Sequence, residues 1–270
     1  MTGDRPPLVL CSGSLGSRPL DEKFRAAAAA GFGWVSVYGG EYDEAKASGL
    51  DVERLRNDLG LRVAEVDGVA LSLGDSGSFE KAIAIARSLE ARSITIVETG
   101  AFDRSDESQM ADAVTAFGAR CDRAAEFGIL VHLEPFSWSN LGSTADAVEI
   151  TTRAARPNGG VLLDLWHHIR GPDGGDLDAA AVAPTLLGIQ LADVLATSSG
   201  SVRNECMTQR QLPGQGHGQL ARRLAELAAH TSLPPIGIEV FGEVLDALPA
   251  ADAARSARDA ALATLTEAGI

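Results

Sequence analysis

An aspartate ends a short apolar run near the middle of the sequence, and two histidines follow it. The run at residues 161–163 is typical of a parallel strand that is buried on both faces. Asp164 then adds a carboxylate that is costly to bury alone, so we expect a cation beside it. The spacing could return His167 to the same place, whereas His168 should point elsewhere. A structural interpretation stays open, in which Asp164 caps a turn and His167 is hydrogen-bonded in a loop.

Glu134, Gln190 and Glu239 interrupt other apolar runs in the same manner. If these runs are neighbouring parallel strands, their polar residues converge at one end of a sheet. Three converging carboxylates repel one another unless a cation neutralises them, and one divalent ion with oxygen ligands would do so. Carboxylate and amide oxygens favour Mg²⁺ or Mn²⁺ over zinc or copper. Each residue alone could instead make a salt bridge or a hydrogen bond in the interior.

Apolar runs alternate with helical patterns along the whole chain. The expected strands are residues 34–40, 62–69, 93–100, 129–136, 159–166, 187–193 and 236–241, preceded by a first strand within residues 8–15 that runs into a loop. The expected helices are residues 20–31, 42–59 with a break at Gly49, 79–91, 105–127, 144–155, 177–182, 220–230 and 252–268. This alternation predicts an α/β fold, a (β/α)₈ TIM barrel, with residues 1–270 as a single domain. In that fold active sites lie at the carboxyl ends of the strands, where we expect Glu134, Asp164, Gln190 and Glu239.

The composition narrows the classes of function. The 270 residues are 45% hydrophobic with a mean hydropathy of +0.04, and no run approaches the roughly 20 apolar residues of a membrane span. The net charge of −14 argues against binding to a nucleic-acid backbone. Three widely spaced cysteines predict reduced thiols. Because the N-terminal residues lack the pattern of a signal peptide, we expect a cytoplasmic protein without nucleic-acid or membrane partners.

Five short motifs give the sequence a resemblance to a known superfamily. They are LEPF (133–136), LLDLWH (162–167), QLAD (190–193), PGQG (213–216) and IEVF (238–241). In order and spacing they resemble the xylose isomerase-like TIM-barrel superfamily of sugar isomerases and epimerases. The resemblance implies one divalent metal ion held by Glu134, Asp164, Gln190 and Glu239. It also implies catalytic roles for Glu134 and Glu239 on opposite faces of the substrate, and for His167 in substrate binding or proton transfer.

Gln190 departs from the superfamily's ketose epimerases, most of which carry histidine at that place. Glutamine there and an arginine before PGQG, here Arg210, are similar to the pattern of 3-dehydroshikimate dehydratases. The carboxylate-binding arginine that those dehydratases usually carry after the third strand is absent from VDGVALSLG (66–74). Both reactions begin by removing a proton beside a carbonyl. The prediction is therefore an isomerase or epimerase that acts on a sugar or another polyhydroxylated ketone through an enediolate. The alternative is a lyase that eliminates water, with His167 as general acid.

Other functions and contacts follow less directly. Arg210, His132 and Trp166 are the candidate substrate-binding residues, although solvation of the arginine, a hydrogen-bonded core histidine and tryptophan packing explain them equally simply. The polar connection 194–218 could close as a lid. A metal-dependent nuclease needs more histidines than the 5 present. A non-catalytic barrel subunit stays a remote alternative, and a homo-oligomer is possible.

Overall fold

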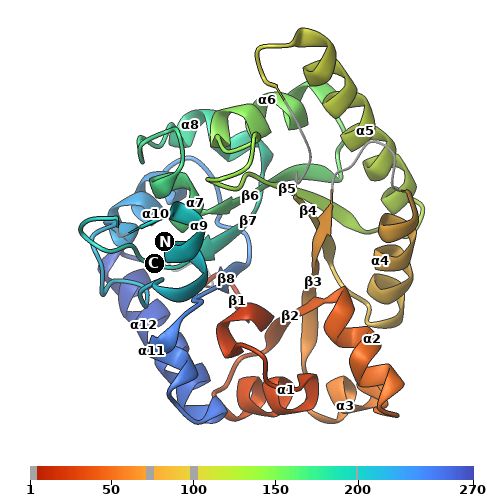
Figure 1. The fold of residues 1–270 in the computed structure, drawn as a ribbon, viewed down its shortest axis with the longest axis vertical. Coiled ribbons are helices and arrows are strands. Elements are labelled where there is room, and N and C mark those ends of the chain that lie inside the picture. Colours follow the sequence, from red (N-terminus) through yellow and green to blue (C-terminus); the bar gives the residue numbers. More distant parts are fainter. Residues whose placement is uncertain (1–4, 71–75, 98–102, 199) are drawn as a thin grey trace.

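The computed structural model describes residues 5–70, 76–97, 103–198 and 200–270, and it shows a closed barrel of parallel strands surrounded by helices (Figure 1). Each strand pairs with the next one in the chain, and the last pairs with the first. The strands are β1 (Leu8–Leu10), β2 (Trp34–Tyr38), β3 (Arg62–Ala70), β4 (Ser93–Val97), β5 (Leu130–Glu134), β6 (Gly159–Asp164), β7 (Leu186–Leu191) and β8 (Ile236–Ile238). The predicted TIM barrel is therefore confirmed.

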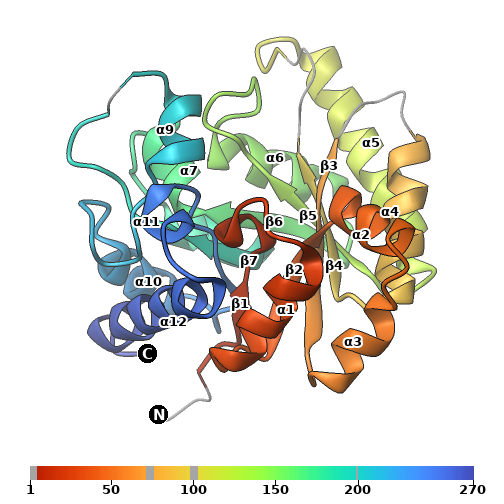
Figure 2. The ribbon, with the colours of Figure 1, turned by 60° about the horizontal axis from the view of Figure 1, so that its bottom comes forward.

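Helices cover the outside of the barrel. They are α1 (Leu20–Ala29), α2 (Gly39–Ala47), α3 (Val52–Asp58), α4 (Ser76–Ser88), α5 (Glu107–Ala125), α6 (Thr144–Ala154), α7 (Leu165–Arg170), α8 (Ala179–Val182), α9 (Val202–Thr208), α10 (Leu220–Ala228), α11 (Glu243–Asp246) and α12 (Ala250–Glu267). The last long helix, α12, packs beside α1 and so joins the two ends of the helical layer (Figures 1 and 2). In the described part of the chain, no helix is long and apolar enough to cross a membrane.

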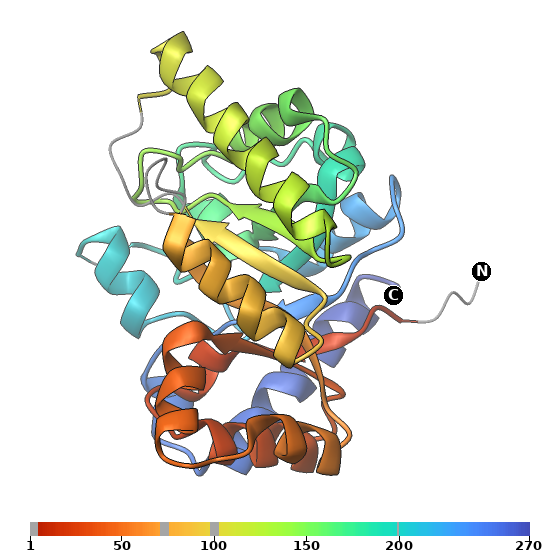
Figure 3. The ribbon, with the colours of Figure 1, turned by 90° about the vertical axis from the view of Figure 1, so that its right-hand side faces the viewer.

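The two ends of the barrel carry different segments. In Figure 3, β4 (yellow) points toward the side on which α9 (cyan) lies. The carboxyl ends of the parallel strands therefore face the segments that follow β6 and β7, which include α7 and α9. This is the end at which TIM barrels build their active sites.

Two glycines leave room for polar side chains inside the barrel. A Cβ at Gly237 would lie 2.7 Å from Cys11 Sγ and 3.1 Å from Gln190 Cγ. A Cβ at Gly188 would lie 3.2 Å from His132 Cε1. Because a close-packed interior has no spare volume for such atoms, glycine at these places allows Gln190 and His132 to point inward.

The connection after β7 is anchored by the aspartate of the QLAD motif. The buried Asp193 carboxylate accepts the backbone N–H groups of Val194 at 2.8 Å, Gly214 at 3.1 Å and Gly218 at 2.7 Å. One side chain thus fixes both ends of a loop that would otherwise leave several backbone donors unpaired.

The middle of the same connection is tied to α7 through α9. Glu205 of α9 is buried and accepts the Nε–H of Arg170 in α7 at 2.8 Å, and the hydroxyl of Ser198 at 2.6 Å. These bonds hold α9 over the barrel, and the next residues carry Arg210 back to it.

The break predicted at Gly49 is confirmed, because residues 42–59 contain two helices, α2 and α3, that are separated near Gly49, whose φ is +86°. The structure differs from the predicted elements in other places. The strand expected to Trp166 ends at Asp164, because that carboxylate accepts the N–H groups of Trp166 at 2.7 Å and His167 at 3.3 Å and so starts α7. Helix α9 was not predicted within the 194–218 connection. The end of the predicted strand 93–100 lies outside the described residues.

Candidate active site

A cavity of about 350 Å³ opens at the carboxyl ends of the strands. Three acids and one arginine share it with aromatic rings, so charged groups face an otherwise apolar wall. The lining residues include Tyr38, Asp67, Val97, Glu134, Phe136, Trp138, His167, Cys206, Met207, Arg210, Glu239 and Phe241. A mostly apolar cavity with a few convergent charges is the usual setting of a small-molecule site.

The four predicted metal ligands lie on four consecutive strands or directly after them. Glu134 ends β5, Asp164 ends β6, Gln190 lies in β7 opposite Asp164, and Glu239 follows β8. All four side chains are buried. The fold therefore brings the four residues to the same end of the barrel.

Three groups at this end lie close enough to share one ion. Glu134, Asp164 and His167 each offer one ligand atom, and these atoms all lie within 4.8 Å of one another. Among the described residues, Glu134 Oε1 and Gln190 Oε1 are buried without a hydrogen-bond partner. A buried oxygen without a donor is unfavourable, and a divalent cation would satisfy both. The residues present therefore fit a metal ion, although Glu239 is not part of the three-atom group.

Arg210 lies between two of the predicted ligands. Its Nη1 donates to Asp164 Oδ2 at 2.8 Å and to the main-chain oxygen of Glu239 at 3.1 Å, and it is 3.4 Å from Glu239 Oε2. Its Nη2 donates to Cys206 Sγ at 2.9 Å and lies 3.2 Å from His167 Nε2. The cation expected beside Asp164 is thus Arg210, whose own side chain is 1% exposed.

His167 is held as a neutral ring. Arg210 can only donate, so His167 Nε2 accepts from it. The other ring nitrogen, Nδ1, lies 3.3 Å from the backbone nitrogen of Ser137, which donates to it, and 3.0 Å from Ser137 Oγ. The ring also stacks on Phe136 with centroids 4.7 Å apart. Burial lowers the pKa of His167 to about 3 despite the Asp164 carboxylate, and Arg210 adds to the lowering. The neutral ring can accept a proton or bind a metal, but it has no proton on Nε2 to donate.

The two glutamates of the cavity resist ionisation in the absence of a neutralising ion. Burial raises the pKa of Glu134 well above its usual value, and the charges of Glu239, Asp67 and Asp164 raise it further. Burial also raises the pKa of Glu239, to about 7, although Arg210 opposes the shift. Crowded carboxylates of this kind are the arrangement that a bound cation stabilises.

Two predicted substrate-binding residues lie behind the cavity lining. His132 Nδ1 is 3.4 Å from Glu65 Oε2 and 3.5 Å from Thr95 Oγ1, inside the barrel. Trp166 is fully buried and faces the guanidinium of Arg210 at 5.1 Å. A direct substrate contact by His132 or Trp166 stays a prediction.

The sequence reasoning missed Tyr38, Asp67 and Cys206, which line the cavity. Tyr38 and Asp67 are register partners near the ends of β2 and β3, and the Tyr38 hydroxyl donates to Glu239 Oε1 at 3.3 Å. A signal existed for Asp67, because it follows Glu65 by two residues and so shares its inward side of the strand.

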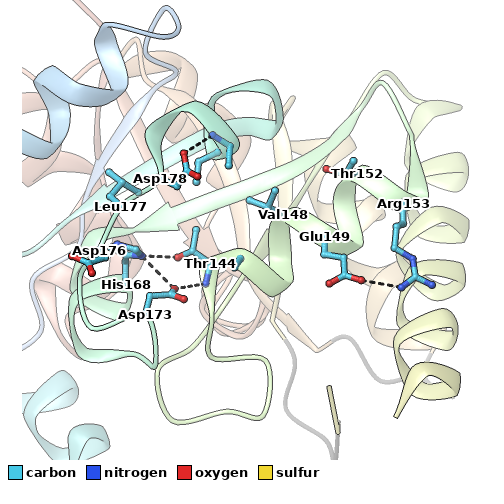
Figure 4. Close-up of a pocket in the computed structure, with 13 residues that line it drawn as sticks. Thr144, Val148, Glu149, Thr152, Arg153, His168, Asp173, Asp176, Leu177 and Asp178 are labelled. Atoms are coloured by element: carbon cyan, nitrogen blue, oxygen red, sulfur yellow. Dashed lines mark hydrogen bonds and ion pairs between the residues drawn. The ribbon is translucent and has the colours of Figure 1, made fainter. Parts of the chain in front are cut away.

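A second cavity, of about 420 Å³, lies between α6 and residues 173–182 and shares no lining residue with the first (Figure 4). His168 lines it, with Nδ1 2.9 Å from Thr144 Oγ1 and 3.5 Å from Asp173 Oδ2. The prediction that His168 points away from the Asp164 site is therefore confirmed.

A closed parallel barrel with a buried Glu, Asp and His group at the carboxyl ends of its strands defines a TIM-barrel protein with a candidate metal site. The sequence identifies the family more closely. A family model described as "Xylose isomerase-like TIM barrel" matches residues 24–264, and the chain belongs to this family.

One curated relative is the 3-dehydroshikimate dehydratase of Pseudomonas aeruginosa strain PAO1. It is 28% identical over 245 residues, which cover 86% of this chain and 38% of the relative, so the chain spans less than half of that protein's length.

Solved structures share the fold at low identity. A xylose isomerase-like TIM barrel/4-hydroxyphenylpyruvate dioxygenase fusion protein has a TM-score of 0.81 at 21% identity, over 96% of this chain and 42% of the other. The IOLI protein, crystallised with a zinc atom, has a TM-score of 0.80 at 15% identity, over 97% and 98% of the two chains. D-allulose 3-epimerase from Methylomonas sp., in complex with D-allulose, has a TM-score of 0.73 at 16% identity, over 96% and 97%.

Proposed function

We propose that this protein is a metal-dependent isomerase or epimerase of a sugar or another polyhydroxylated ketone. One observation carries the proposal: Glu134 and Glu239, from different parts of the barrel, line one cavity beside the candidate metal group. Two carboxylates around one substrate can remove a proton beside a carbonyl and return a proton elsewhere. The fold shared with D-allulose 3-epimerase supports the same class of reaction.

The residues of the cavity have different roles in the proposed reaction. A divalent ion held by Glu134, Asp164, Gln190 and Glu239 would polarise the carbonyl of the substrate. One of the two glutamates accepts the proton beside the carbonyl, and an enediolate forms. The other glutamate, or the same one at the neighbouring carbon, returns a proton and completes the epimerisation or isomerisation.

Other groups hold these carboxylates in place. Arg210 bonds to both Asp164 and Glu239, so it fixes their relative positions. Phe136 and Trp138, whose ring centroids are 5.3 Å apart, form an apolar wall beside His167. Such a wall excludes water from the enediolate and packs against the C–H groups of a sugar.

The oxygen-rich ligand set supports Mg²⁺ or Mn²⁺ as the cofactor. The zinc atom of the IOLI structure belongs to that protein. A nitrogen ligand from His167, which lies within the three-atom group, would shift the preference of this site toward zinc. Competition between Mn²⁺ and Zn²⁺ for the purified protein decides between the two ligand sets.

A 3-dehydroshikimate dehydratase is the second candidate. The 28% identity to the Pseudomonas aeruginosa dehydratase favours it. Its reaction starts with the same proton removal, after which the enolate expels a β-hydroxyl group that leaves as water. The carboxylate-binding arginine that those dehydratases usually carry after the third strand is absent from residues 66–74, which is why we place this candidate second.

Proton NMR in D₂O tests the two candidates directly. Mg²⁺-loaded protein is incubated with a panel of ketoses, including D-allulose and D-fructose, and separately with 3-dehydroshikimate. Replacement of the proton beside a ketose carbonyl by deuterium, with a new sugar appearing, supports the isomerase or epimerase. Formation of an aromatic acid from 3-dehydroshikimate would make the protein a dehydratase.

Two variants serve as controls for this experiment. Glu134→Gln should abolish exchange, whereas Glu44→Gln, at an exposed position of α2, should leave it unchanged. Equal exchange by the wild type and Glu134→Gln would reject the proposed role of the cavity. Failure of the protein to bind any divalent metal would instead support a non-catalytic barrel subunit. A cytoplasmic location, a small-molecule partner and a possible homo-oligomer stay predictions.

A further inference from the structure

Asp67 is an acid of the cavity that the proposed reaction does not use. It lies near the end of β3, opposite Tyr38 of β2, and it lines the cavity together with Glu134 and Glu239. Only 6% of its surface is exposed. A carboxylate at such a place needs either a partner in the protein or a partner in the ligand.

Asp67 Oδ1 accepts the backbone N–H of Gly68 at 2.7 Å, and among the described residues no nitrogen of a basic side chain lies within 4.0 Å of the carboxylate. Because Asp67 lines the cavity, a ligand there can reach its carboxyl group. Gly68 has a φ of +77°, and this left-handed turn places its N–H beside the carboxylate without a clash from a side chain.

Two basic side chains of the described residues already have acidic partners. Arg104, the next basic residue after β4, is directed to Asp146 of α6 at 3.1 Å. The guanidinium of Arg210 is already shared by Asp164 and Glu239.

The charges of the cavity also disfavour a substrate carboxylate near Asp67. One divalent ion and Arg210 would supply three positive charges, and the acids Asp67, Glu134, Asp164 and Glu239 can balance all of them. A substrate carboxylate placed near Asp67 would therefore find no unpaired cation. A substrate hydroxyl would instead donate a hydrogen bond to the Asp67 carboxyl group.

We propose that Asp67 is a specificity-determining residue, which accepts a hydroxyl group of a neutral polyhydroxylated substrate and excludes substrates that carry a carboxylate there. Burial, followed by the charges of Glu65 and Glu239, raises the pKa of Asp67. A hydroxyl can bond to this group in either protonation state. A substrate carboxylate would be repelled by the ionised form and would receive one hydrogen bond but no cation from the neutral form. The inference rests on the proposed function and narrows its substrate class to neutral sugars.

A matched pair of ligands tests this inference. D-fructose and D-fructuronate differ only by a terminal hydroxymethyl or carboxylate group. Their dissociation constants are measured by calorimetry on the Mg²⁺-loaded full chain, so turnover is not needed for the readout. We expect the wild type to prefer the neutral sugar, and Asp67→Asn to reduce the ratio of the two affinities by roughly tenfold or more.

Two further variants keep the test specific. Asp67→Glu retains the carboxylate and should retain the preference, while Asp122→Asn, an exposed position of α5, should not change the ratio. Equal affinity of the wild type for both ligands, an unchanged ratio in Asp67→Asn, or no binding of either ligand would overturn the inference. Absence of ketose exchange in D₂O with a normal affinity ratio would reject the proposed reaction and leave the specificity of Asp67 intact.

Discussion

His167 is a buried imidazole that contacts an arginine, a serine and an aromatic ring at the same time. The sequence placed it three residues after Asp164 and could not assign its role. The structure brings its Nε2 toward Arg210 and to 3.8 Å from Asp164 Oδ2. It can therefore either exchange a proton with substrate or bind the metal ion directly. Loss of the first role would lower the reaction rate, whereas loss of the second would also lower the metal content.

The variant His167→Asn separates these roles. If the ring transfers a proton, the rate of deuterium exchange should fall by about 10² to 10⁴ while metal content stays the same. His168→Asn is the matched control, because His168 lines the other cavity and should leave the rate within a few-fold. Loss of bound metal from His167→Asn would reassign His167 as a ligand.

Arg210 gives a second prediction at this scale. Arg210→Met leaves Asp164 and Glu239 as buried carboxylates without their cation, which typically costs about 3–5 kcal/mol in the free energy of unfolding. A divalent ion bound by those carboxylates should restore part of this loss. Chemical unfolding in EDTA measures the loss of stability, and unfolding in Mn²⁺ measures how much of it the metal ion restores. An equal gain of stability by wild type and variant in Mn²⁺ would contradict this account of the two carboxylates.

The connection 194–218 shows how one side chain can organise an element. The sequence marked this segment as a polar loop that could act as a lid, whereas the structure contains α9 and an anchor at Asp193. The difference has a physical cause: the anchor bonds to backbone groups 1, 21 and 25 residues away, and such contacts leave no local pattern.

Asp193→Ala should therefore destabilise the protein. Each backbone N–H that loses its partner without gaining water costs roughly 1–3 kcal/mol. We also expect weaker binding of substrate, because Arg210 reaches the site through this connection. Urea unfolding and substrate titration check the two effects, and wild-type stability in Asp193→Ala would show that water replaces the carboxylate at little cost.

Glu53 joins three helices at the outside of the barrel. In α3, it accepts bonds from Tyr42 at 2.6 Å and Lys46 at 2.9 Å in α2, and from Ser88 at 2.5 Å in α4. Partial burial would raise the pKa of Glu53, but the bonds from Ser88, Tyr42 and Lys46 lower it from the usual 4.5 to about 2. Its contribution to stability is thus present above pH 4.5 and is lost as the pH falls toward 2.

Glu53→Gln should lower the free energy of unfolding at pH 7 by about 1 kcal/mol or less, as expected for an ion pair near the surface. The difference from wild type should shrink between pH 4.5 and 2, because the wild-type carboxylate becomes protonated there. Glu44→Gln, at an exposed position, is the control. A difference that stays constant down to pH 2 would show that the carboxylate charge is not involved.

At the scale of the whole molecule, the barrel could be predicted from the sequence because its signals are local. Apolar runs such as residues 161–163 and helix-ending glycines such as Gly128 recur at the spacing of β–α units. The polar residues of β5 to β8 were also visible, because each breaks an apolar run. Their common location then follows from strand order.

The rest of the site depends on contacts that span the barrel. Asp67 lies in β3 and Gln190 in β7, which are on opposite sides of the closed barrel. Arg210 contacts Asp164, which is 46 residues away in the sequence. The sequence shows the types of these residues but not which of them are in contact. The carboxyl groups that share one cavity, and the arginine between Asp164 and Glu239, are therefore seen only in the structure.

Metal stoichiometry tests the central claim most directly. Protein stripped with EDTA is loaded with Mn²⁺, and bound metal per chain is measured for the wild type and for Glu134→Gln, Asp164→Asn and Glu239→Gln. We predict one ion per wild-type chain and a large loss of bound metal in each variant, together with loss of ketose proton exchange. A wild-type protein without bound metal, or full occupancy in all three variants, would contradict the account.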